Sequence, residues 1–230
     1  GKVEELLEDG RIDLYDGEIR YLDSLIGDLL STLNECQISD DTVVILTADH
    51  GEQLGQHGCY GHGGVHEAVT FVPIIVWGPK FVPSGKVIDG FVQQIDIAPT
   101  ILELIGVEEL PPLDGESLLP IIRGEKKART SIILEDEEQR AYLDGKWKYI
   151  KDYYVQKEAL YQIEDDPCEV VNLIDREKEI AQRMRASLDE WVQKNLKGRS
   201  DPLPEAAERW RRIWKEFLGR EFPKNATPTP

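Results

Sequence analysis

The four histidines of this 230-residue chain, His50, His57, His62 and His66, lie within 17 consecutive positions. Chance scatter would gather four histidines this tightly in on the order of one sequence in a thousand of this composition. Asp49 directly precedes the first of them, so one turn of backbone offers a carboxylate oxygen and an imidazole nitrogen. Both groups suit a divalent cation. The cluster is therefore the first candidate for a metal or anion site.

Glycines accompany these histidines. An Asp-His pair alone more often belongs to a structural turn than to a metal site, because two ligands do not make a site. Glycine changes that balance, since it lets backbone approach a bound ion or anion closely. Glycines stand at positions 51, 55, 58, 61, 63 and 64. We call residues 50–66 the histidine loop and predict that it binds a ligand.

The elements before and after the histidine loop indicate an α/β fold. Residues 42–48 form a β-branched run with apolar residues on both parities, which predicts a strand covered on both faces. Asp49 and His50 then fall at its carboxyl end, where open α/β sheets place their ligands. Residues 71–77 read as a second buried strand, and Pro73 marks an edge or a strand start.

Two helices should flank these strands. Apolar residues recur at three- and four-residue steps from Leu14 to Leu33, which predicts a helix with one buried face that ends near Asn34. Residues 95–105 predict a second helix that stops at Gly106. The order of helices and strands fits part of a mixed sheet with helices packed on it.

The second half of the chain has a different pattern. Four short strands are expected, and Asp144-Gly145 is a strong hairpin signal between two of them. A helix over 176–196 should cover the resulting antiparallel sheet. Beyond it, a Trp-rich amphipathic segment precedes a polar end, 224–230, that we expect to be disordered. The predicted strands are residues 131–135, 140–143, 147–151 and 159–163.

Composition narrows the classes of partner. The chain has 27 Lys and Arg against 44 Asp and Glu, a net charge of −17, which argues against nucleic-acid and anionic-membrane partners. For the same reason the alternating basic and aromatic residues of 146–151 are interpreted as an exposed strand face. The apolar runs are too short to span a bilayer. Three widely spaced cysteines favour a reducing, cytoplasmic compartment.

Several blocks in order resemble the sulfatase family of the alkaline phosphatase superfamily. They span about residues 10 to 195 and include 14–23, 71–75, 92–106, 114–118, 146–149, 160–167 and 172–173. The central block is Thr47-Ala-Asp49-His50-Gly51-Glu52-Gln-Leu54-Gly55-Gln-His57-Gly58-Cys-Tyr-Gly61-His62-Gly63.

The resemblance implies a sulfate-ester hydrolase that holds one divalent cation, usually Ca2+, at the strand ends. Asp49 and His50 match the second half of the family's metal ligands, where some members have Asp-Asn. His62 stands where many members place a lysine that contacts the sulfate and the leaving oxygen. A histidine can donate to an anion and release a proton near neutral pH, so His62 is expected to be an anion contact and a candidate general acid. His57 is a candidate substrate contact or support for the ligands, and His66 is interpreted as structural.

One family motif is missing from this sequence. Family members carry a Cys or Ser, followed within a few residues by Pro and Arg, which is oxidised to a formylglycine nucleophile, and paired aspartates near the N-terminus complete the metal site. Cys36, Cys59 and Cys168 lack that pattern. The chain therefore resembles the C-terminal half of a sulfatase and is expected to be inactive alone. Residues 1–125 would belong to the catalytic α/β domain, 126–197 to a small antiparallel-sheet subdomain, and 198–230 to a partly disordered extension.

Two other functions stay open. A phosphoric- or phosphonic-ester hydrolase of the same superfamily would act on a similar tetrahedral oxyanion, and only the nucleophile would separate it from a sulfatase acting on a small sulfate ester. Alternatively, the chain is a non-catalytic binding module with a degenerate anion site. Calcium binding by the chain alone would favour that last function.

Overall fold

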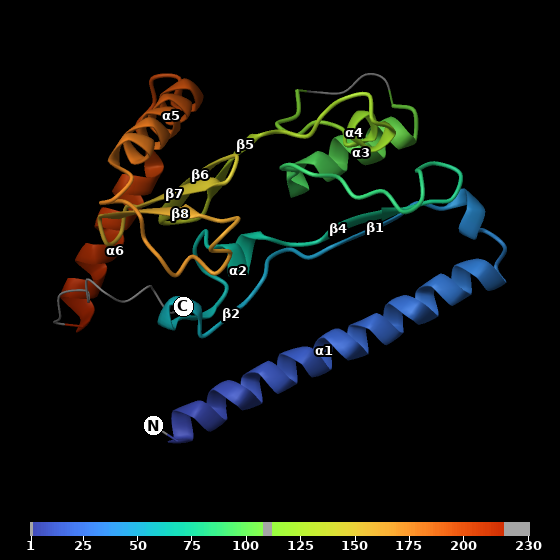
Figure 1. Cartoon of the computed structure of the whole chain (residues 1–230), viewed down its shortest axis with the longest axis horizontal. Helices are drawn as coiled ribbons and strands as arrows, with labels where there is room; N and C mark the ends of the chain where they lie inside the picture. Colours follow the sequence, from blue (N-terminus) through green and yellow to red (C-terminus); the bar gives the residue numbers. More distant parts are fainter. Residues whose placement is uncertain (1, 108–111, 219–230) are drawn as a thin grey trace. The chain divides into compact units, whose positions relative to one another are not determined.

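The computed structural model describes residues 2–107 and 112–218, which divide into two compact units (Figure 1). Unit 1 comprises residues 1–49 and 72–129, and unit 2 comprises residues 50–71 and 130–230. The chain passes from one unit to the other between Asp49 and His50. The histidine loop thus folds with the second half of the chain. The division at 1–125, 126–197 and 198–230 stays a prediction.

Unit 1 begins with a long helix, α1 (Lys2–Glu35), followed by the 3-10 turn η1 (Ser39–Asp41). Strands β1 (Val44–Thr47) and β4 (Ile74–Trp77) pair antiparallel, and Pro73 directly precedes β4, as expected of a strand start. The turn η3 (Gln94–Asp96) leads into α3 (Ile97–Leu104), and α4 (Leu119–Arg123) follows. The predicted ends of the two longer helices, near Asn34 and Gly106, are confirmed within one or two residues.

The core of unit 1 is small and centres on α4. Its buried side chains pack against partly buried residues of β4 and α3, such as Val76 and Leu104. Asp96 is fully buried and is held by two hydrogen bonds from Arg129, at 2.5 and 2.7 Å, and by the amides of Gln93 and Glu116. Burial opposes ionisation of Asp96, but these donors outweigh it and lower the pKa of that carboxyl. The buried residues of α4 and its start are Leu118, Leu119, Ile121 and Ile122.

Two expectations for unit 1 are wrong. Most of the apolar stripe on α1 is exposed, with Leu14 at 73% and Leu22 at 55%, so the predicted buried face is not covered within the part of the chain that the structure describes. Strand β1 was expected to be covered on both faces. Among the described residues it pairs with β4 alone, and all four of its residues are only partly buried. Apolar periodicity predicts which face of a helix would be buried, but it does not predict which element covers that face.

Unit 2 is built on a four-stranded antiparallel sheet in the order β5-β6-β7-β8. The hairpin of β6 and β7 turns at Asp144-Gly145, as predicted, and Gly145 has the positive φ of 56° that this turn requires. Helix α5 (Lys178–Leu196) packs Met184 and Leu188 onto the fully buried Tyr149 and Leu160. Helix α6 (Pro202–Leu218) follows. The strands are β5 (Ser131–Glu135), β6 (Gln139–Asp144), β7 (Trp147–Asp152) and β8 (Lys157–Gln162).

The structure describes no helix that combines the length and apolar character needed to cross a membrane. The predicted disorder of residues 224–230 lies outside the described residues. Cys36, Cys59 and Cys168 are not joined in disulfide bonds, and Cys59 is the buried one.

Candidate functional site

The histidine loop folds as a small hairpin followed by a short helix. Strand β2 (Gln53–Leu54) pairs with β3 (Tyr60–Gly61), and the turn η2 (Gln56–Gly58) joins them. The turn requires left-handed backbone at Gly55, with φ 112°, and at His57, with φ 57°. Helix α2 (Glu67–Thr70) starts directly after His66. This hairpin sorts the four histidines into two stacked pairs.

The first pair is His50 and His62. Their ring centroids lie 4.2 Å apart, with the planes 23° from parallel. His62 Nδ1 donates to Glu52 Oε2 at 3.3 Å. One ligand atom from each of these three residues lies within 4.8 Å of the others. His62 is exposed, with 55% of its side-chain surface accessible, so this group opens to solvent.

The backbone around Gly51 fixes the ring of His50. His50 Nδ1 donates to the Gly51 carbonyl at 2.9 Å, which makes Nε2 the nitrogen with a lone pair in the neutral ring. The Gly51 amide donates to Val69 O of α2 at 2.7 Å. A Cβ at position 51 would lie 2.1 Å from Ala68 O, so only glycine fits there. Helix α2 therefore sets the position from which His50 offers a ligand nitrogen.

Asp49 ends unit 1, and a side chain of η3 fixes its backbone. Gln94 Nε2 donates to Asp49 O at 3.0 Å and also to Ala48 O. The polar side chain of Gln94 in η3 thus holds the backbone just after β1. The joint metal-ligand role of Asp49 and His50 stays a prediction.

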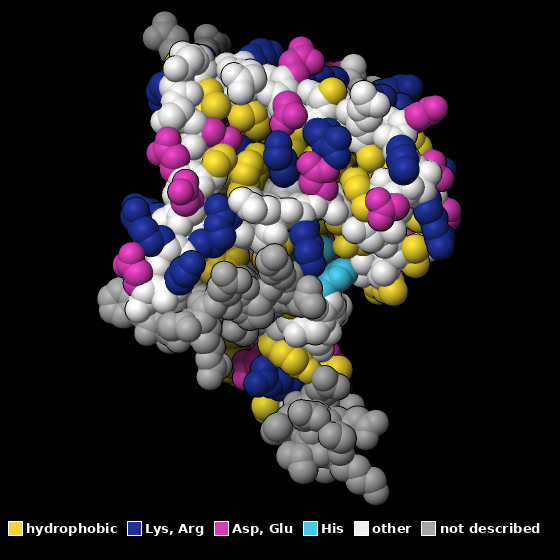
Figure 2. All heavy atoms as spheres, turned by 90° about the vertical axis from the view of Figure 1, so that its left-hand side faces the viewer, with side chains coloured by type: hydrophobic (Ala, Val, Ile, Leu, Met, Phe, Trp, Pro, Cys, Tyr) yellow, Lys and Arg dark blue, Asp and Glu magenta, His cyan; other side chains and the backbone are white. Residues whose placement is uncertain are grey.

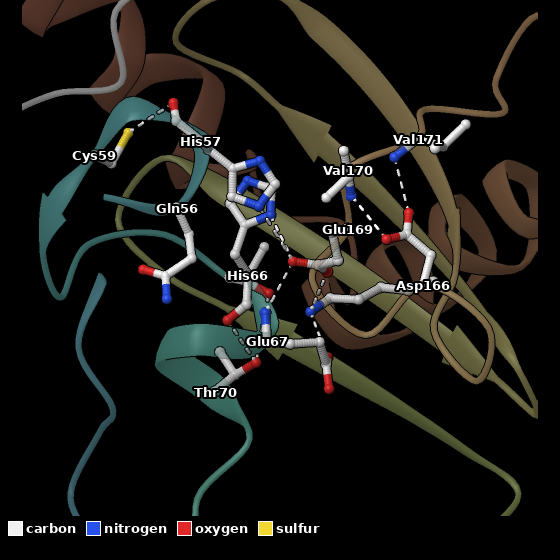
Figure 3. A network of polar contacts seen from close by, with 12 residues as sticks. Gln56, His57, Cys59, His66, Glu67, Thr70, Asp166, Glu169, Val170 and Val171 are labelled. Atoms are coloured by element: carbon white, nitrogen blue, oxygen red, sulfur yellow. Dashed lines mark hydrogen bonds and ion pairs between the residues drawn. The ribbon is translucent and has the colours of Figure 1, made fainter. Parts of the chain in front are cut away.

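The second pair is His57 and His66, which face a buried carboxylate (Figure 3). Their ring centroids lie 4.1 Å apart, and a nitrogen of each ring points toward Glu169. His66 Nδ1 donates to Glu169 Oε2 at 2.8 Å, and His57 Nε2 lies 3.8 Å from the same oxygen. The Glu67 amide also donates to Glu169 Oε2, at 3.0 Å. Glu169 thus joins the turn and the C-terminal end of the histidine loop to the loop that follows β8.

A buried lysine completes this second group. Lys148 is fully buried in β7, and its Nζ lies 2.6 Å from Glu67 Oε1 and 2.9 Å from Glu169 Oε1. Burial raises the pKa of Glu169, but the hydrogen bond from His66 and the charge of Lys148 outweigh it and lower that pKa to about 2. Burial and the neighbouring His66 lower the pKa of His57, so its ring is neutral at pH 7. We call His57, His66, Glu67, Lys148 and Glu169 the buried cluster.

The burial of Lys148 corrects the expectation that residues 146–151 form an exposed strand face. Lys148, Tyr149 and Ile150 are all buried, because α5 covers one side of β7 and Glu67 of α2 pairs with Lys148. No local pattern in the sequence indicates this burial, since the glutamates that pair with Lys148 lie 81 and 21 positions away. The network that holds the histidine loop was therefore missed.

The β5–β6 hairpin also holds the loop. The Gly64 amide donates to an Asp136 carboxylate oxygen, and the Val65 amide donates to Gln139 Oε1 at 3.1 Å. On the face that Figure 2 shows, histidine atoms reach the surface next to a Lys or Arg side chain. The loop is thus fixed from several sides while part of it stays accessible.

Comparison with known proteins gives the class. A sequence model of the sulfatase family matches residues 4–107. The choline-sulfatase of Rhizobium meliloti is 32% identical over 168 residues, which cover 69% of this chain and 32% of that enzyme. The chain belongs to the sulfatase family of the alkaline phosphatase superfamily. It spans about a third of the length of the curated relatives it matches.

Solved structures agree with this class. BT4656, solved in complex with its substrate D-glucosamine-2-N,6-O-disulfate, has a TM-score of 0.69 and 27% identity, over 80% of this chain and 40% of that one. A phosphonate monoester hydrolase from Agrobacterium radiobacter has a TM-score of 0.65 and 23% identity, over 77% of this chain and 40% of that one. The second likeness concerns the fold alone. Both support a sulfatase-like hydrolase fold for this chain.

Proposed function

We propose that this chain is the C-terminal half of a formylglycine-dependent sulfatase, to which it contributes metal ligands and an anion contact. The stacking of His50 and His62 at 4.2 Å carries the proposal, because these residues match the family's metal-ligand and anion-contact positions. The 32% identity to a choline-sulfatase favours a small sulfate ester as the substrate.

The residues present fit a divalent cation. His50 offers Nε2 because its Nδ1 is bonded to the Gly51 carbonyl, the arrangement that orients a metal-binding imidazole. Asp49 would add a hard carboxylate oxygen, which suits Ca2+. When bound, a divalent cation neutralises charge on the sulfate oxygens. The remaining ligands and the formylglycine nucleophile would come from the upstream half.

His62 would act as the general acid. Glu52 accepts the hydrogen bond from Nδ1 at 3.3 Å and orients the ring, so Nε2 is the nitrogen left to protonate the departing alcohol oxygen. The proton moves to that oxygen as the sulfur–oxygen bond breaks, so the alcohol leaves neutral. His57 would support the loop that carries His62, since it lies in the buried cluster rather than beside His50.

Turnover of an aryl sulfate by the full-length protein tests these roles. The 230-residue chain alone should show no turnover, since no cysteine lies in a modifiable motif. In the full-length protein, Asp49→Ala should abolish activity, and His62→Ala should lower kcat by about 10²–10⁴-fold while metal binding persists. His62→Lys, which restores the residue common in the family, should retain most of the activity. Turnover by the chain alone, or wild-type rates for His62→Ala, would refute the assignment.

A phosphoric- or phosphonic-ester hydrolase is the second candidate, favoured by the fold likeness to the phosphonate monoester hydrolase. Matched aryl sulfate, phosphate and phosphonate esters separate the two, since the preferred ester has the highest kcat/KM. A non-catalytic module is tested by calorimetry with Ca2+ on the chain alone. Half a metal site should bind weakly, whereas an independent module should bind with a dissociation constant on the order of 1 µM or tighter.

A further inference from the structure

The buried cluster contains three metal-binding side chains that the proposed sulfatase site does not use. His57, His66 and Glu169 each offer one ligand atom, and these atoms lie within 4.8 Å of one another. All three belong to unit 2, so their geometry is fixed within one unit. They form a group separate from His50, Glu52 and His62, because His57 and His66 stack on one another, whereas His50 stacks on His62.

We propose that His57, His66 and Glu169 form a second metal site, which binds Zn2+ or a similar transition-metal ion. Two imidazoles and one carboxylate are a common set of zinc ligands, with a fourth position for water. The proposal does not rest on the sulfatase function.

The separations in the cluster fit such an ion. Bonds of about 2.0–2.1 Å at the tetrahedral angle place two ligand atoms about 3.3 Å apart. His66 Nδ1 and His57 Nε2 lie 2.8 and 3.8 Å from Glu169 Oε2, on either side of that value. A shift of about half an ångström in each distance brings both pairs to the spacing that zinc requires. The ion takes the place of the proton that His66 Nδ1 now donates to Glu169. In the neutral ring that proton moves to Nε2, so His66 stays a neutral imidazole when it binds the ion.

The charges around the cluster also favour a cation. Lys148 lies between Glu67 and Glu169, so one ammonium group faces two carboxylates. The cluster therefore has a net charge of −1 when both histidines are neutral. Asp166 and Tyr161 are the further titratable groups beside it, and neither supplies a positive charge. A buried group of this charge is stabilised by a bound cation.

The protein also supports the ligands and leaves a route for the ion. Glu169 is held by Lys148 at its Oε1 and by the Glu67 amide at its Oε2, so the carboxylate is oriented before an ion binds. The histidine loop fixes both imidazoles, with His66 8% exposed. The His57 side chain is 21% exposed, which gives an ion access from solvent.

Calorimetry with ZnCl2 on the 230-residue chain tests the proposal. The His62→Ala chain is the reference, because it lacks the other group of three ligands. It should bind one Zn2+ with a dissociation constant on the order of 1 µM or tighter. Adding His57→Ala should weaken that binding at least 10–100-fold, the loss that removal of a supporting partner alone already causes. His66→Ala in the same background should do the same.

Two further measurements keep the test decisive. Circular dichroism identifies a variant that fails to fold, and His57→Ala is the milder change because that ring is partly exposed. Visible absorption of Co2+ distinguishes a four-coordinate ion in the cluster from the hydrated ion in solution. The proposal is overturned if the His62→Ala chain binds no stoichiometric Zn2+. Binding that survives both His57→Ala and His66→Ala would also overturn it.

Discussion

Replacement of Lys148 by methionine tests whether the buried cluster stabilises the fold. The ammonium group is fully buried and contacts Glu67 at 2.6 Å and Glu169 at 2.9 Å. Methionine fills similar space without the charge, so two largely buried carboxylates lose their cation. Removal of one partner from a buried ion pair costs about 3–5 kcal/mol. If the free energy of unfolding falls by about 3 kcal/mol per molar urea, the urea concentration at the unfolding midpoint should fall by about 1 M or more.

Lys151→Met on the same strand is the matched control. Lys151 lies 2.9 Å from Asp189, but the two side chains are 27% and 51% exposed. Exposed pairs of this kind contribute about 0–1 kcal/mol, so the control should unfold near the wild-type midpoint. Both measurements are made with EDTA, which excludes metal binding. A Lys148→Met chain that is no less stable than the Lys151→Met chain would refute the reasoning.

The effect of Lys148→Met should also depend on pH. Glu169 has a folded-state pKa of about 2 against an ordinary value of 4.5, so it stabilises the fold above about pH 4.5 and loses that contribution as pH falls toward 2. Without Lys148 the folded-state pKa rises, and the contribution at neutral pH shrinks. The difference in stability between wild type and variant should therefore be largest at pH 7 and decrease below pH 4.5. A difference that stays constant down to pH 2 would contradict the electrostatic origin.

Two further changes test other parts of the structure by urea unfolding. Arg129→Met should destabilise unit 1 more at pH 7 than in acid. The guanidinium of Arg129 lowers the pKa of Asp96, so this carboxylate stabilises the fold above its ordinary pKa of 3.8 and loses that contribution as pH falls. Equal losses of stability at both pH values would argue against this explanation. Gly51→Ala should lower the free energy of unfolding by about 1–3 kcal/mol, because its Cβ would lie 2.1 Å from Ala68 O. Gly63→Ala is the control, and it should lower that free energy by less than about 1 kcal/mol because the space around Gly63 is open. Equal costs would refute the steric argument.

The sequence predicts the small sheet well because its signals are local. Asp144-Gly145 specifies the turn between β6 and β7, and the apolar stripe of 176–196 specifies the face of α5 that packs on the sheet. Both depend on residues close in sequence. The stripe on α1 obeys the same periodicity, yet Leu22 and Leu29 are more than half exposed. A helical period therefore predicts the helix more securely than its burial.

The buried cluster could not be predicted, because its contacts join distant segments. Lys148 carries the pattern of an exposed strand residue, and Glu169 lies in a loop with no apolar period. Only the fold brings Glu169, with its left-handed φ of 53°, beneath two histidines 103 and 112 positions earlier in the sequence. A charge that is buried by a partner far along the chain leaves no local signal.

The density of histidines predicted one site, whereas the hairpin produces two groups. His50 and His62 come from the two ends of the β2–β3 hairpin and stack on one another, while His57 from its turn stacks on His66 beyond it. The first pair is largely exposed, and the second faces a buried carboxylate. Because Glu169 also holds the start of α2, and α2 holds Gly51, the second group sets the position of the first. A change at His57 or His66 should therefore affect activity through the position of the loop, whereas a change at His62 should affect the proton transfer itself.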